Sequence, residues 1–240
     1  MSEKTATRSK GARPGTRLRG QLAEAYGARG GHQSVLWLHY SPKAERDFAF
    51  HSNLEYGHYL LVESDIEIEK PDYAPQKRVA RVAGELLATC VDAELQLRSG
   101  GVVWREVKYS DDLAAGAANR ANLQILVQQQ AAQDAAVTHQ VITEKEIFAN
   151  PQRIRNWHLI IPWLASAREW ALHDYSTEVA LFVRRHGRIE FRHALALGDP
   201  EKAGLYGAAL LRLVQVGRLS SDLDDRPFTP RSVFFQADES

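Results

Sequence analysis

The sequence contains almost no cysteine: Cys90 is the only one among 240 residues. A lone cysteine excludes an internal disulfide framework and a zinc site built on cysteines, and it suits a reducing cytosol. No apolar run approaches the roughly 20 residues of a membrane span, and the N-terminus lacks the apolar core of a signal peptide. We therefore expect a cytoplasmic protein with no membrane partner.

An excess of charge of either sign is also missing, since 30 basic residues balance 30 acidic ones. Neutrality neither favours nor excludes nucleic acid, because binding depends on where the charge lies rather than on its sum. The first twenty residues are nevertheless basic. Their one acidic residue is Glu3, and their basic residues are Lys4, Arg8, Lys10, Arg13, Arg17 and Arg19. Residues 1–32 are predicted to form a flexible basic arm, with a short helix over residues 18–26.

Hydrophobic periodicity divides the remainder into an α/β domain, residues 33–150, and a helical domain, residues 151–240. In the first domain the pattern predicts a strand at 35–40, a helix at 54–62, extended segments at 65–69 and 76–82, strands at 86–97 and 102–109, a helix at 114–136 and a strand at 137–142. The resulting order is helix, three strands, helix, strand.

The second domain follows Asn150-Pro151, because a residue before proline avoids the helical region. We expect helices at 152–172, 177–186 and 200–214, a short strand at 216–219 and an irregular tail from Ser220. Helices followed by a small extended element are compatible with a winged helix-turn-helix module. A group of arginines in this module forms either a phosphate-facing patch or an ordinary solvated face. They are Arg184, Arg185, Arg188 and Arg192.

The segment from Asp92 to Lys108 carries the strongest chemical signal. It is predicted to form two strands joined by a tight turn at residues 98–101, with Glu106 and Lys108 on one face. A buried cluster of carboxylates and one ammonium is costly, and proteins keep such clusters mostly to hold a divalent cation or to shift pKa values. Hard oxygen ligands for Mg²⁺, with a cation beside the attacking water, are what metal-dependent phosphodiester hydrolysis requires.

The register of this hairpin decides whether the acids meet. A three-residue loop at residues 98–100 places Asp92 directly across from Glu106, whereas a two- or four-residue loop places it on the opposite face. Gly101 suits the left-handed position of such a loop. Glu94 then also faces Glu106. The alternative is an exposed hairpin whose polar face carries only cross-strand salt bridges.

Glu55 belongs to a capping box, Ser52-Asn53-Leu54-Glu55, in which the serine accepts from a first-turn amide and the glutamate reaches back. That role alone explains the residue without chemistry. The histidines, including His51, His58 and His139, show no metal-ligand spacing and are interpreted as core or surface polar residues.

Several segments together resemble TnsA, the endonuclease subunit of heteromeric bacterial cut-and-paste transposases. They are Ser41-Pro42-Lys43, Phe50-His51-Ser52-Asn53-Leu54-Glu55, Asp65 with Tyr73-Ala74-Pro75-Gln76, Asp92 with Glu106-Val107-Lys108, and Val141-Ile142-Thr143-Glu144 with Arg155-Asn156-Trp157. The resemblance covers about residues 35–160, and the last third matches only in position and helical character. Asp92 with Glu106-Val107-Lys108 is similar to the PD-(D/E)xK nuclease signature, although Val91 stands where that signature has proline.

The resemblance implies a restriction-endonuclease-like core followed by a winged-helix-like domain that binds the partner or DNA. It implies a catalytic set of Glu55, Asp92, Glu106 and Lys108. Mg²⁺ or Mn²⁺ would be held by Asp92, Glu106, the Val107 carbonyl and Glu55, and Glu94 remains an alternative to Asp92. The implied activity is hydrolysis of the strand that frees the 5′ end at transposon termini.

The partners that the resemblance implies are double-stranded DNA at the transposon ends, a DDE transposase and an ATP-dependent regulator of transposition. The protein would be cytoplasmic and associated with the nucleoid when bound to DNA. Two other interpretations remain: another PD-(D/E)xK nuclease that acts in restriction, repair or junction resolution, and a catalytically inactive DNA-binding adaptor.

Overall fold

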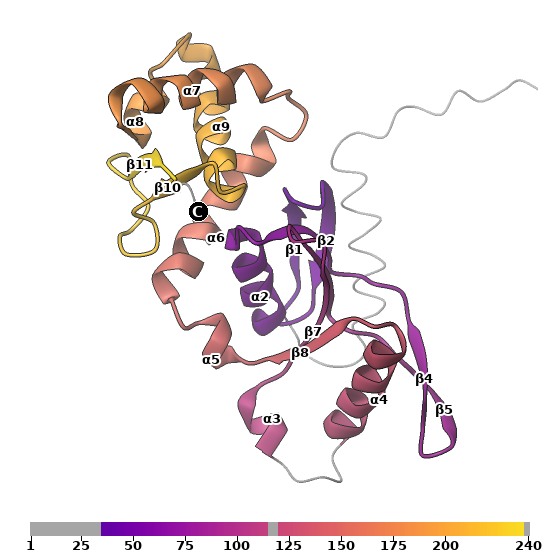
Figure 1. Cartoon of the computed structure of the whole chain (residues 1–240). Coiled ribbons are helices and arrows are strands. Elements are labelled where there is room, and N and C mark those ends of the chain that lie inside the picture. The colour runs from indigo at the N-terminus through magenta and orange to yellow at the C-terminus, as the bar shows by residue number, and fades with distance from the viewer. Residues whose placement is uncertain (1–34, 115–119, 238–240) are drawn as a thin grey trace, which may run out of the picture.

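The computed structural model describes residues 35–114 and 120–237, so the predicted basic arm at residues 1–32 lies outside it. The chain is a mixed α/β protein (Figure 1). The elements up to residue 142 are β1 (Trp37–Ser41), β2 (Arg46–Phe50), α2 (Asn53–Ser64), β3 (Ile68–Asp72), β4 (Arg78–Val82), β5 (Glu85–Thr89), β6 (Ala93–Leu97), β7 (Val102–Val107), α3 (Ser110–Ala114), α4 (Arg120–Asp134) and β8 (Thr138–Ile142).

The central sheet has the strand order β3-β6-β7-β8, with β7 and β8 parallel and the other pairs antiparallel. Helix α2 covers one face, where Val62 packs against Ala93, Leu95 and Val103. Helix α4 covers the other face, where Val127 packs in the same cluster as Trp104. The expected order of helix, three strands, helix and strand is therefore present in α2, β3, β6, β7, α4 and β8, with the β4–β5 hairpin inserted.

The strand predicted over residues 86–97 is wrong as a single element. It consists of β5, which pairs only with β4, and β6, which enters the central sheet after a break at residues 90–92. The β4–β5 hairpin lies beside α4 and extends away from the sheet (Figure 1). Alternation continues through the break, so periodicity alone does not reveal it. Asp92 consequently lies at the entrance of β6 rather than within a long strand.

The β6–β7 hairpin has the register that a three-residue loop requires. Leu97 N donates to Gly101 O at 2.8 Å, and Gly100 N donates to Leu97 O at 2.9 Å. Because Ala93 pairs with Arg105, the next position places Asp92 across from Glu106, as predicted. The left-handed residue is Gly100, with φ of 86°, and not Gly101 as expected.

The remaining elements include a three-stranded sheet with the order β10-β11-β9, which lies above the central sheet in Figure 1. They are α5 (Glu144–Ile147), α6 (Pro151–Ser166), α7 (His173–His186), β9 (Arg188–Glu190), α8 (Phe191–Ala194), the 3-10 turn Pro200–Lys202, α9 (Ala203–Gln215), β10 (Leu219–Ser221) and β11 (Val233–Gln236). The irregular tail predicted from Ser220 is wrong, because β11 pairs with both β9 and β10.

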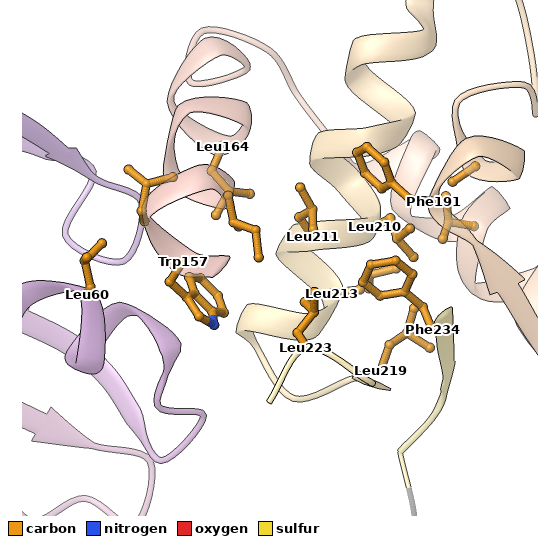
Figure 2. Close-up of a cluster of buried hydrophobic side chains, with 14 of the residues drawn as sticks. Leu60, Trp157, Leu164, Phe191, Leu210, Leu211, Leu213, Leu219, Leu223 and Phe234 are labelled. Atoms are coloured by element: carbon orange, nitrogen blue, oxygen red, sulfur yellow. The ribbon is translucent and has the colours of Figure 1, made fainter. Parts of the chain in front are cut away.

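One hydrophobic core joins both parts of the chain. It contains Tyr59 and Leu60 from α2, Trp157 from α6 and Leu210 from α9. Figure 2 shows Leu60 and Trp157 at one end of the cluster and Phe234 at the other. Helix α6 packs on both α2 and α9. The predicted boundary near residue 150 is therefore a connection across which packing continues.

A buried polar network reinforces this junction around Glu63, at the end of α2. Its carboxylate accepts hydrogen bonds from Ser41 Oγ at 2.5 Å, Tyr73 Oη at 3.1 Å and Gln215 Nε2 at 2.8 Å. Burial raises the pKa of Glu63, while its hydrogen bonds and Lys43 lower it. Because Gln215 lies in α9, this carboxylate links the first helix of the α/β part to the last helix of the chain.

None of the helices within residues 35–114 and 120–237 combines the length and the apolar character that crossing a bilayer requires.

Candidate active site

Asp92 lies at the break between β5 and β6, at the mouth of a cavity. Its Oδ2 accepts a hydrogen bond from the Val107 amide at 2.7 Å, which fixes the carboxylate against the end of β7. The cavity has a volume of about 320 Å³, and its lining includes Glu55, His58 and Asp92. These residues are up to 37 positions apart in the sequence, and the packing of α2 beside the start of β6 brings them to the same cavity.

Glu106 and Lys108 form the adjoining part of the site. The Glu106 side chain is fully buried, and Lys108 Nζ lies 2.5 Å from its Oε1 as an ion pair. Burial lowers the pKa of Lys108, but the contact with Glu106 outweighs it, so the pKa is raised. Lys108 is therefore an ammonium at neutral pH. The alternative of an exposed hairpin with solvated salt bridges is wrong, because Glu106 is inaccessible to solvent.

Glu55 occupies the first turn of α2 and approaches Asp92 from the other wall of the cavity. Ser52 Oγ accepts from the Glu55 amide at 3.0 Å, as the capping box predicts. The Glu55 carboxylate accepts from the His51 amide at 2.9 Å, one residue earlier than the capping box requires. Two interactions at the helix start thus fix a carboxylate whose charge raises the pKa of Asp92.

Glu94, the alternative to Asp92, is engaged elsewhere. Its Oε2 forms an ion pair with Arg78 Nη2 at 2.7 Å, and the Arg78 guanidinium lies over the Trp104 ring. Glu94 lies on the Glu106 face, opposite Trp104, as expected, but its carboxylate pairs with Arg78 instead of Lys108. Arg78 comes from the inserted β4–β5 hairpin, which the sequence pattern did not place against β6.

The electrostatics of Asp92 are those of a strained carboxylate cluster. Burial and then the charge of Glu106 raise the pKa of Asp92 to about 7, although the Val107 amide and Lys108 lower it. Without an added cation, this carboxylate is half protonated near neutral pH. Such perturbed acids concentrate at functional sites.

The donor set fits a hydrated hard cation better than an all-protein cage. Glu106 Oε1 is buried and has no hydrogen bond, only the ion pair with Lys108. In the described part of the chain, no three His, Cys, Asp or Glu side chains gather closely enough to hold a metal ion by themselves. Mg²⁺ commonly binds through one or two carboxylates and keeps several waters. Asp92, Glu106 and the Val107 carbonyl are the groups that could hold such a cation.

Comparisons with known proteins leave this geometry as the main evidence on function. No protein-family model matches the chain, and no curated protein sequence matches it.

Two polar residues near the site were not predicted to have a role there. Gln128 of α4 is completely buried and donates from Nε2 to Glu106 Oε2 at 2.6 Å. His58 lines the cavity, and its Nε2 is buried without a partner; burial lowers the pKa of His58 to about 3, so the ring is neutral. The signal for Gln128 was a polar side chain at a core position of an otherwise apolar helical face.

Proposed function

We propose that this protein is a metal-dependent DNA endonuclease, the subunit of a heteromeric transposase that hydrolyses the strand freeing the 5′ end at each transposon terminus. The observation that carries the proposal is the meeting of Asp92 and Glu106 across one hairpin register, with Lys108 paired to Glu106. Two acids and a lysine at the end of a sheet, beside a helix-borne acid, match the requirements of phosphodiester hydrolysis.

The order of elements supports a restriction-endonuclease-like core. Helix α2, strands β3, β6 and β7, helix α4 and the parallel strand β8 follow one another as that core requires. The second part has the succession helix, strand, helix, helix and two strands, with the last strand in the middle of the sheet, which resembles a winged helix-turn-helix unit.

In the proposed mechanism each side chain has a distinct task. Asp92, Glu106 and the Val107 carbonyl would hold Mg²⁺ or Mn²⁺, which when bound would supply a water of lowered pKa and offset charge on the phosphate. Lys108 orients the attacking water and stabilises the negative charge that builds on the phosphate oxygens. Glu55 receives hydrogen bonds from water in the cavity. Before metal binds, the Lys108 ammonium reduces repulsion between the carboxylates.

The winged-helix-like unit is proposed to contact DNA or the partner transposase through its exposed basic residues rather than through α9. Six consecutive residues of α9, positions 206–211, are buried, and a helix surrounded by protein is not free to enter a major groove. Arg184, Arg185, Arg188 and Arg192 are exposed. Contacts of this kind make DNA affinity fall steeply with salt.

The proposal is tested by nicking of supercoiled plasmid with Mg²⁺ or Mn²⁺, using the full chain alone and with its proposed partner, a DDE transposase. We expect cleavage by the wild type and by Glu94→Gln, whose carboxylate is paired with Arg78, and none by Asp92→Asn. The two substitutions make the same chemical change two residues apart, so together they assign the ligand. No cleavage by the wild type under either condition, or equal cleavage by Asp92→Asn, contradicts the proposal.

The same assay separates the two alternatives. A restriction, repair or junction-resolving nuclease cuts without a partner transposase, and its cleavage does not depend on transposon ends. An inactive adaptor binds DNA but never nicks it. Glu55, Glu106 and Lys108 all lie close enough to Asp92 to shift its pKa, and this unbroken set favours an active enzyme over an adaptor.

A further inference from the structure

Gln128 of α4 contacts three residues around the site through its side-chain amide. Its Nε2 donates to Glu106 Oε2 at 2.6 Å and to the Cys90 carbonyl at 2.9 Å, while its Oε1 lies 3.2 Å from His139 Nε2. The Gln128 side chain is completely buried, so each of these contacts is made without competition from solvent. We infer that Gln128 is a positioning residue that holds both proposed metal-binding carboxylates in register.

The orientation of the Gln128 amide follows from its neighbours. A carboxylate and a backbone carbonyl are both acceptors, so the amide nitrogen must face them and spend its two hydrogens there. The amide oxygen is then left for His139, which must carry its proton on Nε2. Burial lowers the pKa of His139, which favours the neutral ring with a single ring proton. His139 lies on β8 directly beside Trp104 of β7.

This arrangement fixes the two carboxylates by different routes. Glu106 is held directly at Oε2, which leaves Oε1 toward Lys108. Asp92 is held indirectly, because the Cys90 carbonyl belongs to the break that turns the chain into β6 two residues before Asp92. Partners that orient ligating carboxylates typically change metal affinity by about 10- to 100-fold when they are removed. Gln128 therefore sets the separation of the ligands without touching substrate or cation.

The inference rests on the proposed metal-dependent function, and a titration without DNA tests it. We expect Gln128→Met, which keeps the length of the side chain but cannot donate, to weaken Mn²⁺ binding to the full chain by about 10- to 100-fold in calorimetry. The matched control is Gln130→Met on the same helix, since Gln130 donates to Asp134 at an exposed position. Its affinity for Mn²⁺ should equal that of the wild type.

A second variant protects the test against misfolding. His139→Leu leaves Gln128 in place but removes the hydrogen bond to its amide oxygen, and we expect Mn²⁺ binding to weaken by several-fold, with an unchanged circular dichroism spectrum. Wild-type affinity in folded Gln128→Met, or in His139→Leu if the first variant does not fold, overturns the positioning role and leaves the proposed function standing. No Mn²⁺ binding by the wild type itself overturns the proposed function as well.

Discussion

Lys108→Met should reduce the rate of DNA strand cleavage by roughly 100- to 1000-fold, the range found when one preorganised charge-stabilising donor is removed. The methionine keeps the apolar stem of a side chain that is 21% exposed, but it removes the ammonium that lies 2.5 Å from Glu106. Metal binding should move in the opposite direction. Lys108 competes with a cation for Glu106 Oε1, so the variant should bind Mn²⁺ at least as tightly as the wild type.

The opposed effects make this result informative. Single-turnover cleavage at saturating Mn²⁺ measures the rate, and calorimetry measures the affinity. Lys145→Met is a suitable control, because Lys145 is exposed and lies outside the site. If Lys108→Met cuts at the rate of the wild type, Lys108 has no part in the reaction. If cleavage and metal affinity fall together, the lysine supports the ligands rather than the chemistry.

Asp92→Asn should stabilise the metal-free protein at pH 8 by about 2 kcal/mol. Burial and Glu106 raise the pKa of Asp92 to about 7 in the folded state, against 3.8 for the unpaired group. Each pKa unit between the folded and unfolded states corresponds to about 1.4 kcal/mol of free energy of unfolding. We expect less than the whole of that free energy because Asp92 retains contact with solvent. The asparagine can still accept from the Val107 amide without adding charge.

The pH dependence has a defined direction. Between about pH 4 and pH 7 Asp92 binds more protons in the folded state than in the unfolded chain, so its contribution to stability falls as pH rises through this window. The difference between Asp92→Asn and wild type should be absent near pH 4, grow up to pH 7 and stay constant above it. Denaturant unfolding at several pH values in EDTA measures it. A wild type that equals or exceeds the variant in stability at pH 8 would show that the carboxylate is not strained.

Mn²⁺ should reverse this order. A ligand that binds only the folded state stabilises it by an amount that grows with concentration, and only the wild type retains both carboxylates. The substitution that stabilises the metal-free chain should therefore remove the stabilisation by metal, as is common where function requires a strained site.

The sequence allowed the centre of the site to be predicted because that centre is local. Asp92 and Glu106 lie on one hairpin, and the turn residues at 98–100 determine their register. A change of one residue in the loop moves Asp92 to the opposite face of the hairpin. The prediction of a three-residue loop was therefore enough to place Asp92 across from Glu106. Glu55 was assigned to the site only by the family resemblance, because its capping box, which the structure contains at Ser52 and Glu55, explains the residue without chemistry.

The parts that could not be predicted depend on contacts between distant segments. Arg78 pairs with Glu94 only because the first residue of β4 lies close to β6, 16 positions later in the sequence. Gln128 reaches Glu106 only because α4 crosses the sheet at that height. Strand β11 was missed because a strand of four residues is too short to show alternation, and its pairing with β9 is 43 residues distant in sequence at Val233 and Glu190.

The most direct test of the account is the position of Mn²⁺ in crystals of the full chain, located by anomalous scattering. The account predicts one peak between the carboxylates of Asp92 and Glu106, beside the Val107 carbonyl, and no peak there in Asp92→Asn. Crystals grown at saturating Mn²⁺ that show no peak at this position, or that show the two carboxylates turned away from each other, would contradict it.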